Sequence, residues 1–223
     1  MTDPGTVVRA RALTKTYARG DEQVHALREV GLSLHPGELV ALVGPSGSGK
    51  STLLNVLCGW ERADSGTLEW TAELALQPPD RLPWGRLAIV PQALGLLEDL
   101  TIGENILLPA RLTGRLRELQ PRAAELMDAV GIGHLSVRYP RQTSLGEQQR
   151  LSFACAVIGR PAIVVADEPT AELDSASADR VLEAVHDLRD EGVAFLLSSH
   201  DPRVVESADH LLRLEHGRVV ESW

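Results

Sequence analysis

The sequence predicts an α/β fold in which helices cover a mainly parallel β-sheet. Short apolar runs of β type alternate with stretches of helical apolar spacing, and this alternation is typical of parallel sheets. Residues 162–166 form a continuous apolar run, as expected for a strand that is buried on both faces. The pattern is mostly helical between residues 99 and 159. We therefore expect one domain, 1–223, with a core from about 1–98 and 160–223 and an inserted helical subdomain at about 99–159.

The first half of the chain is expected to begin with strands. Prolines and glycines bound the β-like runs, and the third run ends at a glycine-rich segment. A stretch with helical apolar spacing follows this segment and stops before Gly59. A loop with several prolines, at 78–83, separates the last two strands. The predicted elements are strands at 7–17, 30–34, 38–43, 67–70 and 87–90, and a helix at Lys50–Leu57.

The second half begins with helices and returns to strands. Three helical patterns precede the apolar run 162–166, and a further helix and strand follow it. A short hairpin around His216 and Gly217 ends the chain. The predicted elements are helices at Ile102–Leu112, 121–130, 144–158 and 177–190, and strands at 162–166 and 193–198.

Composition and charge exclude several classes of protein. The formal net charge is −9 and no block of Lys and Arg occurs, which argues against a nucleic-acid partner. Cys58 and Cys155 lie inside apolar runs without paired spacing, so we expect small buried residues rather than a disulfide or a zinc site. The start resembles no secretory signal, and no uncharged apolar stretch reaches about 18 residues. These features predict a cytosolic chain.

A glycine-rich segment lies between the third strand and the first helix. It reads G-P-S-G-S-G-K-S and fits the pattern G-x-x-x-x-G-K-[ST] in the strand-to-helix context that this motif requires. Its backbone N–H groups can converge on phosphate oxygens at a helix N-terminus. Lys50 would reach the β- and γ-phosphates, and Ser51 would offer its hydroxyl to Mg²⁺. We expect the nucleotide to contact Gly44, Pro45, Ser46, Gly47, Ser48, Gly49, Lys50, Ser51 and Thr52.

Two acidic residues follow the apolar run 162–166. Parallel strands deliver such residues to the edge of the sheet that also carries the phosphate loop. Asp167 suits a Mg²⁺ ion held through water, because Mg²⁺ prefers hard oxygen ligands and keeps much of its hydration. Glu168 is then placed to orient and deprotonate the attacking water. Alone, the pair could also be two acids that end a strand.

With these two motifs the chain resembles the ATP-binding cassette (ABC) ATPases nearly from end to end. The family has a P-loop NTPase core, an N-terminal antiparallel β subdomain and an inserted helical subdomain. The resemblance implies ATP and Mg²⁺ as cofactors, with Glu168, His200 and Lys50 in catalysis and Ser51, Gln92 and Asp167 at the metal. It adds five features in the family's order: Tyr17 for stacking on adenine, Gln92 in the Q-loop, Ser144, Gly146 and Glu147 in the signature, Asp174 in the D-loop, and His200 as the switch histidine.

The chain departs from the family pattern at two places. The first glycine of the signature is replaced by Leu145. If this position needs a positive φ, leucine costs roughly 1–3 kcal/mol of strain, similar to the ~1.5–3 kcal/mol of one charge-assisted hydrogen bond to phosphate. We expect a weakened but working site, and more ATPase activity when glycine is restored. The second departure is Pro91 before Gln92, which together with the proline-rich stretch 78–83 affects the coupling surface.

The resemblance also implies partners. Two cassettes of this family enclose two ATP molecules, so we expect a second cassette, as a homodimer, and a separate transmembrane permease subunit. Residues 24–27, 139–142 and the segment after the Q-loop resemble lipoprotein-releasing (LolD-like) and macrolide-exporter (MacB-like) cassettes. We expect the permease to contact the chain near Gln92 to Leu97 and to hold it at the inner face of the plasma membrane. Leu94, Leu96 and Leu97 are candidates for the receiving groove, or else subdomain core.

Rival classes share these motifs. DNA-repair and chromosome-structuring ATPases carry a long coiled coil between P-loop and signature, whereas Ser144 follows Lys50 by only 94 residues here. Translation-factor ATPases carry two cassettes in one chain. An importer motor stays open, although only 23 residues follow His200. A regulatory cassette that turns over slowly stays open as well, because of Leu145, while Glu168 and His200 argue against it.

Overall fold

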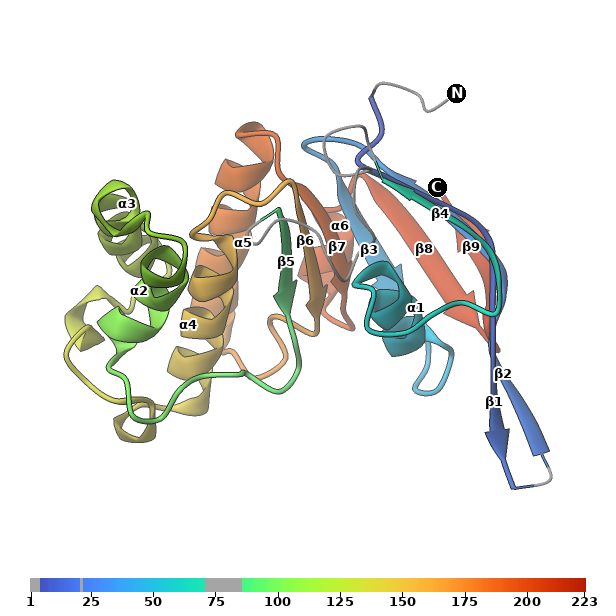
Figure 1. Ribbon diagram of the computed structural model, residues 1–223, viewed down its shortest axis with the longest axis horizontal. Helices are drawn as coiled ribbons and strands as arrows, with labels where there is room; N and C mark the ends of the chain where they lie inside the picture. The colour runs from blue at the N-terminus through green and yellow to red at the C-terminus, as the bar shows by residue number, and fades with distance from the viewer. Residues whose placement is uncertain (1–4, 21, 71–85) are drawn as a thin grey trace.

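The computed structural model describes residues 5–20, 22–70 and 86–223, and its strands form two sheets (Figure 1). The larger sheet has the order β5-β6-β7-β3-β8-β9. The first five of these strands run parallel, and β9 pairs antiparallel with β8. The mainly parallel α/β core is thereby confirmed. Its strands are β3 (Leu39–Val43), β5 (Leu87–Val90), β6 (Ile163–Asp167), β7 (Ala194–Ser198), β8 (His210–Glu215) and β9 (Arg218–Ser222).

The smaller sheet is antiparallel and comes from the N-terminal part of the chain. Its order is β2-β1-β4, with β1 at Val8–Arg19, β2 at Glu22–Leu34 and β4 at Ser65–Trp70. This confirms the expected antiparallel β subdomain. Strand β2 begins well before the predicted start at residue 30. Its first half is mostly exposed, so it lacks the apolar alternation by which a half-buried strand is recognised.

Six helices are present in the described part of the chain, with two short 3₁₀ turns at Gly133–Leu135 and Pro140–Gln142. Helices α1 and α2 have the predicted bounds. Helix α3 begins five residues before the predicted start at Pro121, because Leu119 is buried and Leu116 packs against the same core. This packing outweighs the preference of proline for a first turn. The helices are α1 (Lys50–Leu57), α2 (Ile102–Leu112), α3 (Leu116–Ala129), α4 (Leu145–Val157), α5 (Ser175–Asp190) and α6 (Pro202–Glu206).

Strands β3, β6 and β7 of the large sheet are buried on both faces, and their alternate residues belong to different cores. In β3, Leu39 and Ala41 pack with the helical part of the chain, while Val40 and Leu42 pack with α1 and the antiparallel sheet. Figure 1 shows the resulting order, with α2, α3 and α4 at one end, the core sheet in the middle and β1, β2 and β4 at the other end. We keep as a proposal that 99–159 forms a separate subdomain.

The parallel strands bring four predicted site segments to one edge of the sheet. Strands β5, β6, β7 and β3 are neighbours, and their carboxyl ends lead to Gln92, Asp167, His200 and the glycine-rich loop. The proline-rich stretch 78–83 lies outside the described residues. Within the described segments, no helix is long and apolar enough to span a bilayer.

Candidate nucleotide-binding site

The loop between β3 and α1 depends on glycine at two positions. Gly44 and Gly49 have φ values of 148° and 110°. A Cβ atom at Gly44 would lie 2.1 Å from the carbonyl oxygen of Leu214, and one at Gly49 would lie 2.2 Å from that of Ala26. The loop therefore packs directly against neighbouring backbone. Since α1 begins at Lys50, its first N–H groups have no acceptor within the helix and can serve an anion.

Lys50 is buried, and its ammonium group lies inside this loop. Its Nζ donates to the carbonyl oxygens of Gly44 at 2.7 Å and Pro45 at 3.3 Å. A lysine needs such acceptors, because an unpaired buried ammonium would be strongly unfavourable. From this position the side chain can make the predicted contact with the β- and γ-phosphates of a nucleotide.

The predicted magnesium ligands lie next to one another. The Ser51 hydroxyl donates to Asp167 Oδ2 at 3.1 Å, and Gln92 lines the same cavity. A hydroxyl and a carboxylate oxygen at hydrogen-bond distance are hard ligands of the type that Mg²⁺ prefers. The residues present therefore fit a Mg²⁺ ion.

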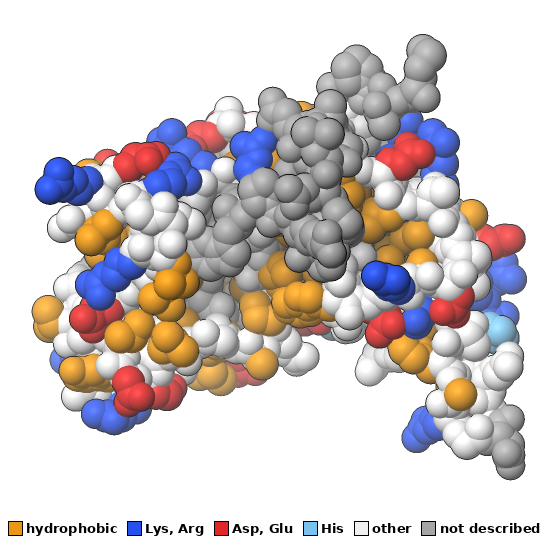
Figure 2. Space-filling view, viewed as in Figure 1, with side chains coloured by type: hydrophobic (Ala, Val, Ile, Leu, Met, Phe, Trp, Pro, Cys, Tyr) orange, Lys and Arg blue, Asp and Glu red, His pale blue; other side chains and the backbone are white. Residues whose placement is uncertain are grey.

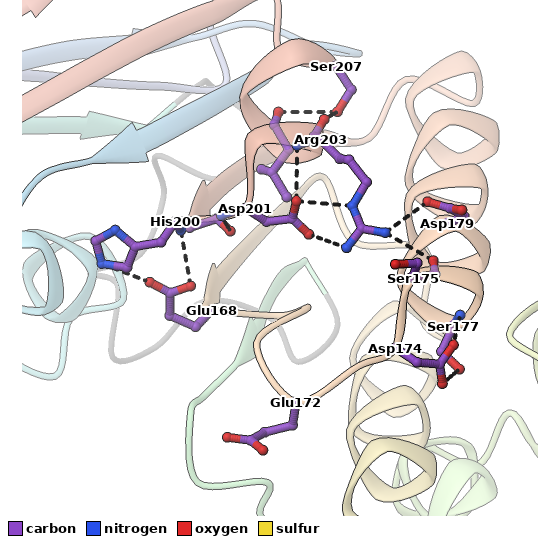
Figure 3. Close-up of polar contacts among 12 residues, drawn as sticks. Glu168, Glu172, Asp174, Ser175, Ser177, Asp179, His200, Asp201, Arg203 and Ser207 are labelled. Carbon is purple, nitrogen blue, oxygen red and sulfur yellow. Dashed lines mark hydrogen bonds and ion pairs between the residues drawn. The ribbon is translucent and has the colours of Figure 1, made fainter.

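Glu168 and His200 form a pair at the ends of adjacent strands (Figure 3). Glu168 Oε1 lies 3.4 Å from His200 Nε2, and its Oε2 accepts the backbone N–H of His200 at 3.3 Å. Glu168 has a φ of 54°, and its N–H donates to the carbonyl oxygen of Ser198 at 2.9 Å. A glutamate in the left-handed region stores strain of the kind found at functional sites. The backbone thus turns this carboxylate toward the histidine.

These residues share one open cavity of about 850 Å³. The predicted residues that line it come from five separate parts of the chain, and they are Tyr17, Ser46, Gly47, Gly49, Lys50, Ser51, Thr52, Gln92, Asp167, Glu168 and His200. Gly44, Pro45 and Ser48 belong to the same loop but do not line the cavity. Its volume suits a nucleotide, since ligand sites usually measure about 300–1,000 Å³.

The signature residues lie elsewhere, at the start of α4. Ser144 is the N-cap of this helix and accepts the N–H of Glu147 at 3.3 Å. Glu147 Oε2 in turn accepts from Ser144 N at 2.7 Å and Oγ at 3.0 Å, and the bond from the backbone holds the pKa of this carboxyl below its usual range. Ser144, Gly146 and Glu147 do not line the cavity. One chain therefore does not bring its signature and its phosphate loop together.

Leu145 adopts a helical conformation as the first residue of α4, and its φ is not positive. The backbone strain that leucine would suffer at a positive φ is therefore absent at this position. The side chain is 52% exposed at the N-terminal end of the helix. The predicted gain of activity on restoring glycine thus depends on the bulk of the exposed side chain rather than on backbone strain.

Arg203 and Gln149 lie near this site, and neither of them was assigned a role from the sequence, although Gln149 belongs to the signature segment 144–150. Arg203 holds Asp201 through two hydrogen bonds of 3.0 and 2.7 Å and reaches Asp179 at 3.1 Å, so it ties the loop of His200 to the start of α5 (Figure 3). This pairing lowers the pKa of Asp201 below its usual range. Gln149, on α4, contacts the loop that begins with Glu168. Neither follows a periodic pattern.

Asp174, a predicted D-loop residue, is the N-cap of α5.

A second, apolar groove lies between β5, α2 and α4. It measures about 390 Å³, and the predicted Leu94, Leu96 and Leu97 line it. Asn105 holds the segment between β5 and α2 that carries these leucines. Its side-chain amide donates to the carbonyl oxygens of Leu97, Leu100 and Thr101, each at 3.0 Å. Leu96 packs against the core while Leu97 is 48% exposed. Figure 2 shows hydrophobic side chains at the surface over α2 and near β5.

Comparison with known proteins gives consistent relatives. Residues 27–171 match the family model described as ABC transporter. The lipoprotein-releasing system ATP-binding protein LolD of Novosphingobium aromaticivorans is 43% identical, over 97% of this chain and 99% of that protein. The macrolide export ATP-binding/permease protein MacB of Shigella flexneri is 37% identical over 94% of this chain, which spans a third of that longer protein.

Solved structures agree in fold. The dimeric structure of MJ0796, a bacterial ABC transporter cassette, has a TM-score of 0.86 and 30% identity, with 97% of each chain covered. A post-hydrolysis state of the same cassette, bound to ADP and Pi, has a TM-score of 0.85 and 28% identity.

Proposed function

This chain belongs to the ABC transporter family, and we propose that it is the ATP-hydrolysing motor subunit of an exporter or extractor of lipoprotein, peptide or antibiotic type. The family resemblance and the ATPase activity predicted from the sequence are confirmed by the family match and the relatives. The subfamily resemblance is confirmed as well, since LolD and MacB are among the matches. The transport of such a cargo is supported by the names of these relatives.

The chemistry follows from the shared edge of the sheet. The loop around Lys50 binds and orients the phosphates, and Glu168 holds the attacking water and accepts its proton. His200 contacts Glu168 and lines the same cavity, so it would bond the γ-phosphate of a bound nucleotide. Bound Mg²⁺, at Ser51 and Asp167 with Gln92, would neutralise charge that develops on the phosphates. The observation that carries this proposal is the single cavity that these groups line.

A second cassette completes the site. Ser144 and Gly146 lie at the start of α4, outside the cavity of their own chain. A second copy can place them against the γ-phosphate, where the helix N-terminus favours negative charge. The dimeric structure described for the MJ0796 cassette supports this arrangement. The chain acts as a homodimer in this proposal.

The apolar groove receives the membrane subunit, which holds the chain at the inner face of the plasma membrane. The segment 94–100, part of which lines the groove, is hydrogen-bonded to Asn105 and presents Leu97 at the surface. We expect a tagged chain, expressed in its own cells, to sediment with the membrane fraction. Leu97→Glu should abolish this sedimentation, since a carboxylate cannot be buried unpaired against an apolar partner.

Leu112→Glu is the matched control, because Leu112 is 70% exposed on the same helical part of the chain but does not line the groove. It should sediment as the unchanged chain does. Thermal unfolding of both variants checks that the fold is kept. Sedimentation that Leu97→Glu leaves intact would contradict the docking site, and an unchanged chain that stays in the supernatant would contradict the membrane partner.

A further inference from the structure

Gln149 connects the signature helix to the backbone of Glu168. Its Nε2 donates to the Glu168 carbonyl oxygen at 2.8 Å, and its Oε1 accepts the N–H of Glu172 at 3.2 Å. The side chain is only 6% exposed, so water competes little for these bonds. The side-chain amide of Gln149 thus bonds two residues of the loop that follows β6, Glu168 and Glu172, and both are labelled in Figure 3.

The bonded residue is the one whose backbone is strained. Glu168 has a φ of 54°, a conformation that a non-glycine residue keeps only when the surrounding structure holds it. Its N–H is held by Ser198, and its carbonyl oxygen is held by Gln149 and by the N–H of Ala171 at 3.3 Å. Ser198 and Ala171 contribute backbone groups, whereas Gln149 contributes a side chain from helix α4.

Helix α4 touches the same loop at further points. A Cβ atom at Gly146 would lie 3.2 Å from the Glu172 carbonyl oxygen and 3.3 Å from a methyl group of Leu173, so the helix packs closely against the loop. Arg150 donates to Ser177, which in turn bonds Asp174. The loop from 168 to 174 therefore packs against the first turns of α4, the helix whose N-cap is Ser144.

We propose that Gln149 is a positioning residue for ATP hydrolysis, which holds the Glu168 carboxylate in place and makes its position depend on the placement of the signature helix. This inference rests on the proposed role of Glu168. A partner's nucleotide that binds at Ser144 would act on Glu168 of the same chain through less than two turns of α4 and one amide. Gln149 itself touches no substrate.

Gln149→Met keeps the length of the side chain but removes both its donor and its acceptor. Gln148→Met is the matched control, because Gln148 bonds the carbonyl oxygens of Pro140 and Thr143 within the helical region and does not contact Glu168. We expect Gln149→Met to lower kcat about 10- to 100-fold, since small misplacements of catalytic groups have effects of this size. The KM for ATP should stay within about twofold, and Gln148→Met should retain the kcat of the unchanged chain within about twofold.

A double-mutant cycle separates positioning from general damage. If Gln149 acts through Glu168, Gln149→Met should not lower the residual hydrolysis of Glu168→Gln any further. The inference would be overturned if the double variant lost kcat by the product of the two single losses. It would also be overturned if Gln149→Met and Gln148→Met had equal kinetics, and either result would leave the ATPase role of Glu168 intact. An unchanged chain whose hydrolysis does not depend on Glu168 would overturn both proposals.

Discussion

Ser144 and Thr101 begin two helices with the same hydrogen-bond pattern. Each is an N-cap whose hydroxyl accepts the N–H of a glutamate three residues later, at 3.3 Å for Ser144 and 3.2 Å for Thr101. Each glutamate returns a bond to the N-cap backbone, at 2.7 and 2.9 Å. Replacing either N-cap by alanine should therefore lower the free energy of unfolding by the same amount, about 1 kcal/mol within a range of about 0.5–2 kcal/mol.

Only Ser144 is proposed to bond the partner's γ-phosphate. Loss of one charge-assisted hydrogen bond costs about 1.5–3 kcal/mol, which corresponds to about a 10- to 150-fold weaker ATP-dependent association per site. We expect Ser144→Ala to weaken the ATP-dependent dimer and slow hydrolysis by such a factor. Thr101→Ala should do neither.

The assay combines urea unfolding of both variants with light scattering and ATPase rates over a range of protein concentrations. We expect the unfolding data to give equal contributions for the two caps, and any functional difference would then belong to the interface. Equal loss of ATPase activity in Ser144→Ala and Thr101→Ala would refute the reasoning, because Ser144 would then matter only as a helix cap.

Three further substitutions test other parts of the account. Leu145→Gly should raise ATPase activity by removing bulk at the proposed interface, with a stability cost of at most about 1 kcal/mol; an unchanged rate would contradict this. Burial raises the pKa of the Cys58 thiol to about 12, so the unfolded chain loses this proton first as the pH rises above about 8.5 and the thiol should cost about 2 kcal/mol of stability at pH 10. Between pH 7 and pH 10, the free energy of unfolding measured in urea should fall less for Cys58→Ala than for the unchanged chain. An equal fall in both proteins would contradict the raised pKa of Cys58. Arg203→Gln should lower kcat by loosening the loop of His200. Because Arg203 lowers the pKa of Asp201, the greater stability of the unchanged chain should be fully present above about pH 4 and should be lost as the pH falls from there through the lowered pKa; a stability difference that persists once Asp201 is protonated would contradict the ion pair.

The phosphate loop and the alternation of strands and helices were readable from the sequence because both are local. The glycine pattern before Lys50 specifies a turn that only small residues allow, and the apolar run ending at Asp167 specifies a buried strand. The position of Asp167 and Glu168 beside the phosphate loop was predicted from the parallel strands, which end at one edge of the sheet. The role of His200 was implied by the family resemblance, and its contact with Glu168 was not predicted.

Contacts between distant segments could not be read in this way. Gln149 bonds the Glu168 carbonyl oxygen 19 residues away, and Arg203 joins its near neighbour Asp201 to Asp179, which is 24 residues away. Gln149 lies in the signature segment 144–150, but its local sequence does not show which backbone group it contacts. The start of β2 was missed because an exposed strand has no apolar alternation. The φ of Leu145 also depended on where α4 begins, and helix ends are the least certain part of a pattern.

The central claim is that two copies of this chain close around ATP before Glu168 completes hydrolysis. The most direct test is light scattering of the purified Glu168→Gln protein with and without ATP in the absence of Mg²⁺, since this change should keep nucleotide binding while it blocks hydrolysis. The account predicts that ATP doubles the measured mass. A mass that stays monomeric at a concentration where ATP binding is demonstrated would contradict it.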